Sequence, residues 1–205
     1  MSGVSNINFQ WTTPDQGYKY PHFKVEGLAA IPGNKLLFGI RELGAKYNDF
    51  DYAVKIISVP YRFDNGEMIL GNTFSLVYDY NPWVNPLLHR RVALSSIEYD
   101  SHKDQLYLLT SFEEGDSDES IGGYLWTLSM EAFKKGCAPK LVMLDKSTPL
   151  LFAHKAEGLA VLDATHVFVI HDDDRVLGRE SIENPETQFH REPHQAAYTI
   201  ILFTP

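Results

Sequence analysis

The 205-residue chain is poor in cysteine and in basic residues. Cys137 is its one cysteine, so the chain can form neither an internal disulfide nor a zinc site built from several cysteines. Lysine and arginine together number 18 against 27 aspartates and glutamates, which gives a net charge of −9 at pH 7. Electrostatic binding to nucleic acid or to an anionic membrane surface is therefore not expected.

Long hydrophobic runs are also missing. None approaches the roughly 18 apolar residues that a membrane-spanning helix requires. Residues 1–9 lack the basic and apolar regions of a signal peptide. We therefore expect no membrane association and take the cytoplasm as the default compartment. With 44% apolar and 22% charged residues, the composition is typical of a folded domain with a sizeable core.

Helical periodicity is nearly absent, and the one candidate helix covers residues 130–135, closed by Gly136. Short apolar, β-branched or aromatic segments bounded by Gly, Pro, Asn or Asp are typical of strands instead. Such segments occur at 35–40, 52–59, 105–109, 123–128, 166–170 and 197–203. Many short strands of this kind indicate an all-β fold.

An internal repeat organises these strands. Glu26-Gly27-Leu28-Ala29 recurs as Glu157-Gly158-Leu159-Ala160, and a degenerate copy lies between them at Ser95-Ser96-Ile97-Glu98. A turn, an apolar strand, a variable loop and a second strand follow each copy. Further strands at 73–78 and 140–144 give the first two units four strands each. We therefore expect a single domain, 1–205, of three β-propeller blades at about 21–80, 89–145 and 153–205.

Three blades pose a problem of closure, because propellers typically have four to eight. An incomplete ring leaves two open sheet faces, which invite pairing. Either a second copy completes the ring as a homodimer, or an N-terminal half-propeller is missing from this chain. Residues 7–11 form a lone candidate strand. It either adds to the last blade of the partner in a two-fold exchange or is a lead-in without defined structure.

Four motifs together resemble a family of largely uncharacterised bacterial β-propellers, which is itself similar to the esterase-like phytase propellers. The motifs are Val25–Ala29, Phe38–Arg41, Ala156–Ala160 and His171–Arg175. The resemblance covers about residues 22–203 as a blade pattern. Because related chains are longer, it implies that this chain is a C-terminal half. The middle unit departs from the family by having Ser95-Ser96 in place of Glu-Gly.

Candidate site residues follow from the repeat, since the innermost strands of a propeller line its channel. Glu26, Ser95 and Glu157 occupy equivalent places in their units. Arg41, Thr110 and Asp172 each come 13 residues after a shared apolar position and are also expected to be equivalent. We predict that Arg41, Thr110 and Asp172 bind a small-molecule ligand whose identity is open.

A calcium ion near the channel is a second expectation. Oxygen ligands from several blades suit a hard cation, and the resemblance implies a structural ion of this kind. Glu26, Glu157 and Asp172 are the expected ligands. In the alternative interpretation, the glutamates pair with Arg41 or accept backbone N–H bonds at a blade junction.

The densest polar cluster is His171-Asp172-Asp173-Asp174-Arg175. Adjacent carboxylates repel one another, so an arginine, a cation or water must compensate. His171, Asp172 and Asp173 are the catalytic candidates, as a general base or as metal ligands; alternatively the cluster is an exposed turn. The preferred function is a ligand-binding or interaction propeller, and the alternative is a metal-dependent hydrolase of phosphate or other esters.

Overall fold

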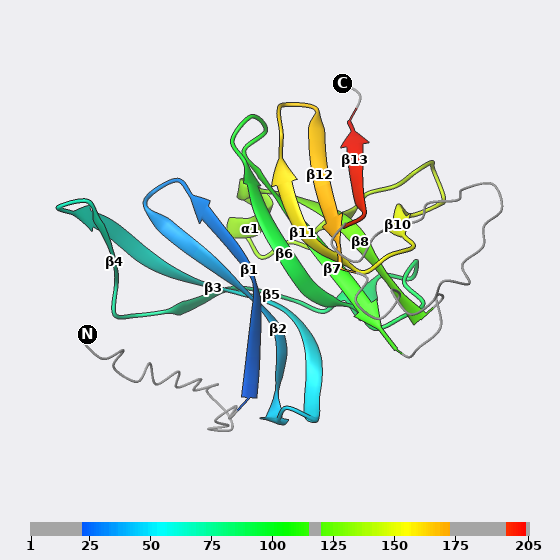
Figure 1. Ribbon diagram of the computed structural model, residues 1–205, viewed down its shortest axis with the longest axis horizontal. Coiled ribbons are helices and arrows are strands. Elements are labelled where there is room, and N and C mark those ends of the chain that lie inside the picture. Colours follow the sequence, from blue (N-terminus) through cyan, green and yellow to red (C-terminus); the bar gives the residue numbers. More distant parts are fainter. Residues whose placement is uncertain (1–21, 115–119, 173–195, 204–205) are drawn as a thin grey trace.

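The computed structural model describes residues 22–114, 120–172 and 196–203. In these ranges the protein is all-β, with three antiparallel sheets, one short α-helix and one 3-10 turn, η1 (Pro82–Val84) (Figure 1). The all-β prediction is confirmed. The sheets do not close into a barrel or ring within the described residues, and residues 7–11 lie outside them.

Sheet 1 is an antiparallel meander in the order β1-β2-β3, and both β4 and β5 pair with β3. Its strands are β1 (His22–Ile31), β2 (Lys35–Lys46), β3 (Asp49–Asp64), β4 (Glu67–Leu70) and β5 (Ser75–Tyr80). An Asn65-Gly66 turn with positive φ at both residues joins β3 to β4, as tight hairpins require. Strand β5 occupies the place expected for the fourth strand of the unit.

Sheet 2 has the order β6-β7-β8, with two short strands pairing along the far edge of β8. Its strands are β6 (Ala93–Asp100), β7 (Gln105–Glu113), β8 (Ile121–Ser129), β9 (Lys140–Leu141) and β10 (Leu151–Phe152). The strand expected at 140–144 is therefore shorter than predicted. Helix α1 (Met130–Lys134) follows β8 as expected, and Gly136 at φ 67 follows it.

Sheet 3 has three strands: β11 (Ala156–Val161), β12 (His166–His171) and β13 (Tyr198–Leu202). Each sheet thus begins with a repeat copy, in β1, β6 or β11. Strand β6 contacts both β1 and β11, so the first strands lie side by side where the sheets converge (Figure 1). This convergence brings the three repeat copies together.

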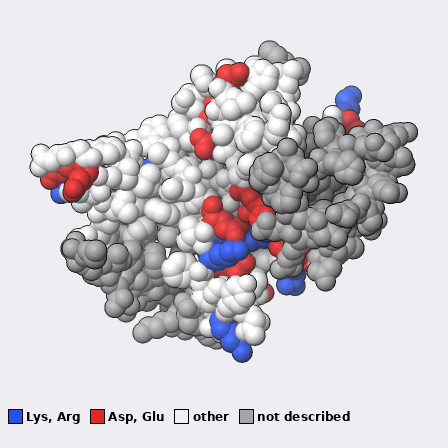
Figure 2. All heavy atoms as spheres, viewed as in Figure 1, with Lys and Arg blue, Asp and Glu red and all other residues white. Residues whose placement is uncertain are grey.

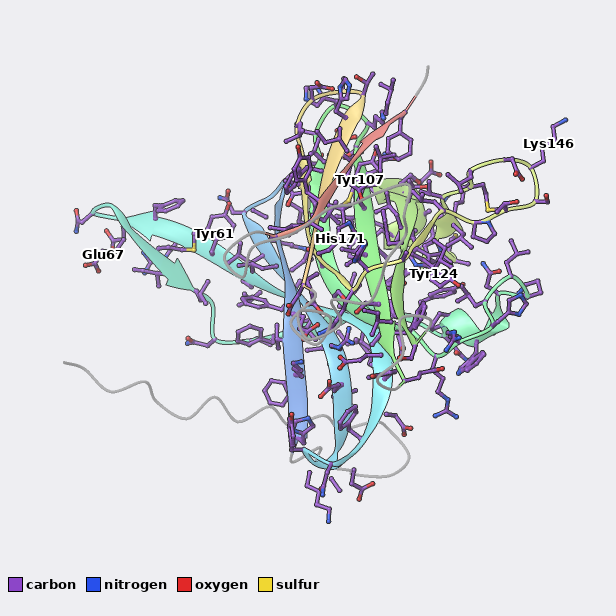
Figure 3. The ribbon with its side chains drawn as sticks, turned by 45° about the vertical axis from the view of Figure 1, so that its right-hand side comes forward. Tyr61, Glu67, Tyr107, Tyr124, Lys146 and His171 are labelled. Atoms are coloured by element: carbon purple, nitrogen blue, oxygen red, sulfur yellow. The ribbon has the colours of Figure 1, made fainter. Side chains whose placement is uncertain are left out.

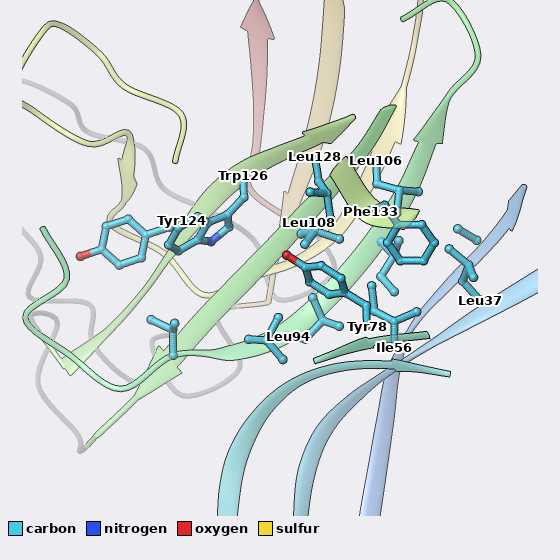
Figure 4. Packing of buried hydrophobic residues seen from close by; sticks show 14 of the residues in the cluster. Leu37, Ile56, Tyr78, Leu94, Leu106, Leu108, Tyr124, Trp126, Leu128 and Phe133 are labelled. Carbon is cyan, nitrogen blue, oxygen red and sulfur yellow. The ribbon is translucent and has the colours of Figure 1, made fainter. Parts of the chain in front are cut away.

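The two larger hydrophobic clusters lie one on each face of sheet 2, and a third, smaller cluster lies within sheet 1 around Ile40 and Ile57. Leu106 and Leu108 of β7 join the cluster shared with sheet 1, which Figure 4 shows around Leu37 and Ile56. Tyr107 and Leu109, which alternate with them, join the cluster shared with sheet 3. Because successive side chains of a strand point to opposite faces, this continuous apolar run fits a central sheet covered on both sides.

Sheet 1 lies close against sheet 2 at Gly27 and Gly39, which pair across β1 and β2. A Cβ atom at Gly39 would lie 2.6 Å from Leu94 Cδ2 and 3.1 Å from the Cα of Gly27. A Cβ atom at Gly27 would lie 2.7 Å from Ile97 Cγ1. Glycine at these two positions therefore makes room for side chains of β6.

The variant Gly39→Ala is expected to lower the free energy of unfolding by about 1–3 kcal/mol, because an added carbon overpacks a filled interface. Urea denaturation measures the change. Ala30→Val is the control, since Ala30 is exposed on the neighbouring strand β1 and should tolerate the added bulk. Equal midpoints for the two variants would contradict the close packing of sheet 1 on sheet 2.

Candidate functional site

Each sheet carries a β-bulge at the same place in its first strand. The register of β1 on β2 shifts between Val25 and Gly27 and leaves Glu26 without a partner residue. Equivalent shifts leave out Ser95 in β6 and Glu157 in β11. The register therefore confirms that Glu26, Ser95 and Glu157 are equivalent. A bulge re-aims its side chain, and here it does so in all three sheets.

The second set of equivalent residues needs one correction. Leu28, Ile97 and Leu159 pair with Phe38, Leu108 and Val169. Three residues beyond these partners lie Arg41, Ser111 and Asp172, so Ser111 is equivalent to Arg41, and Thr110 is not. The prediction that Thr110 is equivalent to Arg41 assumed the same spacing in every unit. It was wrong because the turn between β6 and β7 is one residue longer than the turn between β1 and β2.

Thr110 instead belongs to the interior of sheet 2. Its hydroxyl accepts a hydrogen bond of 2.9 Å from Trp126 Nε1 and lies 3.4 Å from the carbonyl oxygen of Tyr124. Its exposed fraction is 1%. These contacts give Thr110 a structural role between β7 and β8.

Arg41 joins sheet 1 to sheet 2. Its Nη1 donates hydrogen bonds of 2.9 Å to Ser95 Oγ and 2.8 Å to Ser111 Oγ, and its Nε lies 3.3 Å from Glu26 Oε2. The side chain is 2% exposed, and its guanidinium lies over the Tyr52 ring at 5.3 Å. A buried guanidinium requires this degree of pairing.

Lys155 joins sheet 3 to sheet 2. It precedes β11, and its Nζ lies 2.8 Å from Glu157 Oε1 and 3.4 Å from Glu113 Oε2. We refer to Glu26, Arg41, Ser95, Ser111, Lys155 and Glu157 as the polar centre. Figure 2 shows acidic and basic side chains gathered near the middle of the viewed face, over the region where the first strands converge in Figure 1.

The sequence similarity between the first and third repeat copies extends two residues before the Glu-Gly-Leu-Ala tetrapeptide. A lysine stands two residues before the glutamate in the first and third units, as Lys24-Val25-Glu26 and Lys155-Ala156-Glu157. Both pairs form ion pairs, with Lys24 Nζ 2.6 Å from Glu26 Oε1. Extending the repeat by two residues would therefore have found Lys155. Ser111 and Glu113 had no comparable sequence signal.

Burial raises the pKa of the Glu157 carboxyl above its usual value of 4.5, and the charge of Glu26 adds to this effect. Lys155 and Arg41 act in the opposite direction without cancelling it. Burial acts to lower the pKa of Lys155, but its pairing with Glu157 and Glu113 outweighs burial and raises the value. The polar centre is thus electrostatically coupled across all three sheets.

Two of the three catalytic candidates, His171 and Asp172, lie at the end of β12. His171, labelled in Figure 3, is 4% exposed. Its Nε2 lies 2.9 Å from Thr199 Oγ1, and its ring adjoins those of Phe152 and His154. The backbone N–H of Asp172 donates to the carbonyl oxygen of Lys155 at 2.9 Å, which places Asp172 beside the polar centre. Asp173 lies outside the described residues.

The polar centre does not fit a calcium ion well. Calcium takes six to eight oxygen ligands, and no group of three or more His, Cys, Asp or Glu side chains is arranged for a metal among the described residues. The carboxylates of Glu26 and Glu157 are already paired with Arg41 and Lys155. The hydroxyls of Ser95 and Ser111 are likewise engaged by Arg41, so too few oxygens are available for this coordination number.

No protein-family model, curated protein or solved structure matches the chain. The resemblance to the bacterial β-propeller family therefore stays a prediction. Within the described ranges, no helix has the length and apolar character to cross a membrane.

Replacing Arg41 by methionine is expected to lower the free energy of unfolding by about 3 kcal/mol, because it leaves Glu26 less compensated and two serines without their donor. The change is measured by urea denaturation. Arg62→Met is the matched control, since the ion pair of Arg62 with Asp64 is 63% exposed on the arginine side and such pairs contribute below about 1 kcal/mol. A loss as small as that of the control would contradict the role given to Arg41.

The raised pKa of Glu157 predicts a pH dependence. The folded state binds this proton more tightly than the unfolded state, so the stabilisation from protonation is full below pH 4.5 and is lost as the pH rises through the raised pKa. Wild type should therefore lose stability relative to Glu157→Gln between pH 4 and pH 7. Melting temperatures across this range test the trend, and Glu131→Gln on α1 is the control. Parallel curves for all three proteins would contradict it.

Proposed function

We propose that this chain is a binding domain built from propeller-like blades, and that the polar centre is its ligand site. The ligand class that we infer is a small molecule carrying a positive charge. The observation that carries the proposal is the set of three equivalent bulges, which direct Glu26, Ser95 and Glu157 to one place. Bulges of this kind are over-represented beside binding and active sites.

The sheet arrangement supports the propeller-like part of the proposal. Sheets 1 and 2 each contain a meander whose last long strand pairs with a further strand, and the sheets pack face to face through two apolar clusters. The first strands lie side by side, as the inner strands of blades do around an axis. The polar centre then lies on the axial side of the blades.

The charge of the site supports a cationic ligand. The ion pairs of this region involve four carboxylates and three permanently basic groups. The carboxylates are those of Glu26, Glu42, Glu113 and Glu157, and the basic residues are Lys24, Arg41 and Lys155. One negative charge remains in excess. A carboxylate has about four lone-pair sites, so it can accept from a ligand N–H while it keeps its protein partner.

The raised pKa of Glu157 points the same way. Its charged form is disfavoured by burial and by Glu26. A cation bound between these two carboxylates would stabilise both. The side chain of Glu157 is 22% exposed and that of Lys155 is 20% exposed, so ligand can reach this edge of the polar centre. Nothing among the described residues specifically favours ester hydrolysis.

Isothermal titration calorimetry tests the proposal with four probes: agmatine and spermidine as organic cations, phenyl phosphate as an anion, and Ca²⁺. We expect an organic cation to bind and phenyl phosphate not to bind. Glu26→Gln and Glu157→Gln should each weaken binding at least tenfold, because each removes an ionic contact.

Glu131→Gln, a carboxylate from the exposed ion pair of α1, is the control and should leave affinity unchanged. Circular dichroism melting curves establish that each variant is folded at the titration temperature. Binding of phenyl phosphate alone, or of a cation with equal affinity to all three variants, would contradict the site.

A further inference from the structure

Equivalent residues of the three sheets have sharply different exposure. Ile97, in the middle copy of the repeat, is 1% exposed, whereas its equivalent Leu28 in sheet 1 is 58% exposed. Tyr107 is fully buried in β7, whereas its equivalent Phe168 in β12 is partly exposed. The difference follows the position of each sheet in the stack, because sheets 1 and 3 each have one face on which no other sheet packs among the described residues.

Two kinds of sheet face account for the packing inside the chain. The leading face contains Ile97 and Leu108 in sheet 2 and packs on the preceding sheet 1. The equivalent residues of sheet 3, Leu159 and Val169, pack on sheet 2. Both internal interfaces therefore use a leading face on the later sheet.

The trailing face is the opposite side of each sheet. Leu37 of sheet 1 packs on sheet 2 from this side, and its equivalent in sheet 2, Tyr107, packs on sheet 3. Each internal interface is thus a trailing face against a leading face, and the pattern occurs twice in the chain.

In the described part of the chain, the two faces without a neighbouring sheet are one of each kind. On the leading face of sheet 1, Ile40 and Ile57 are buried in a small cluster of their own, whereas Leu28 and Leu76 are 58% and 44% exposed. Sheet 3 has its trailing face without a neighbouring sheet. Cross-strand pairing places Tyr198 opposite Ile170 and Ile200 opposite Phe168; Tyr198 and Ile200 are 62% and 51% exposed. Apolar side chains gathered on one exposed sheet face are typical of interaction surfaces.

We propose that a second copy of this chain covers both faces, with sheet 3 of each copy packed on sheet 1 of the other. The contact continues the trailing-to-leading pattern already formed twice within the chain. Two such contacts related by a two-fold axis would place each of the described sheets between two others. The result has six sheets, within the usual range of four to eight for a ring of blades. This assembly requires no ligand, so its failure is distinguishable from failure of the proposed ligand site.

Light scattering at several protein concentrations is the first test, and the expected mass is twice 23.3 kDa. Leu28→Glu and Ile200→Glu should each give a monomer, because each places an uncompensated charge in both contacts of the dimer. Leu144→Glu is the control: Leu144 is 66% exposed but lies outside both faces, so this variant should stay dimeric. A wild-type monomer at every concentration would overturn the proposal. It would favour a different polypeptide as the partner of the exposed faces of sheets 1 and 3.

Cross-linking tests which faces meet. In a Cys137→Ser background, the double variant Leu28→Cys/Ile200→Cys should give a covalent dimer with a short bismaleimide. The two single-cysteine variants should stay uncross-linked, because neither face meets its own copy. Efficient cross-linking of either single variant would show that like faces pair and would overturn the arrangement, even if the mass were that of a dimer.

Discussion

A guanidinium buried between two sheets is the constraint on which the centre of this molecule depends. Arg41 is 2% exposed, and its charge cannot be left unpaired in such a position. Two serines of sheet 2 and two glutamates of sheet 1, Glu26 and Glu42, supply its partners. Two of the partners, Glu26 and Ser95, come from bulges. The bulges in β1 and β6 therefore each supply one partner to the guanidinium of Arg41.

The same centre extends to sheet 3 through Lys155, which bridges carboxylates of β7 and β11. Its ion pairs differ from those of an exposed helix pair such as Lys135 with Glu131, because they are part of a coupled, partly buried network. Partial burial makes such groups responsive to any additional charge. For this physical reason we propose the ligand site at the polar centre.

Much of the fold could be predicted from the sequence. Alternating apolar segments and turn residues predicted most strands, and Gly136 marked the end of α1. The repeat predicted the equivalence of Glu26, Ser95 and Glu157, because similar local sequences produce similar register and the same bulge. The predicted equivalence of Thr110 and Arg41 was wrong. One extra turn residue shifts every later position of the second unit, so Ser111 is the residue equivalent to Arg41. A shift of one residue also reverses the face, which explains why Thr110 bonds Trp126 in the interior.

By itself, the sequence determined the all-β class, the three repeat units and the equivalence of Glu26, Ser95 and Glu157, because strand patterning and turn chemistry are local properties of the chain. Tertiary structure alone decided that these three residues lie at bulges, which groups surround Arg41, that Lys155 and Glu113 meet, and which faces of the described sheets pack on another sheet. These depend on contacts between residues far apart in sequence, such as the 70 positions that separate Arg41 from Ser111. No local pattern encodes such a contact, since it exists only once the sheets have packed.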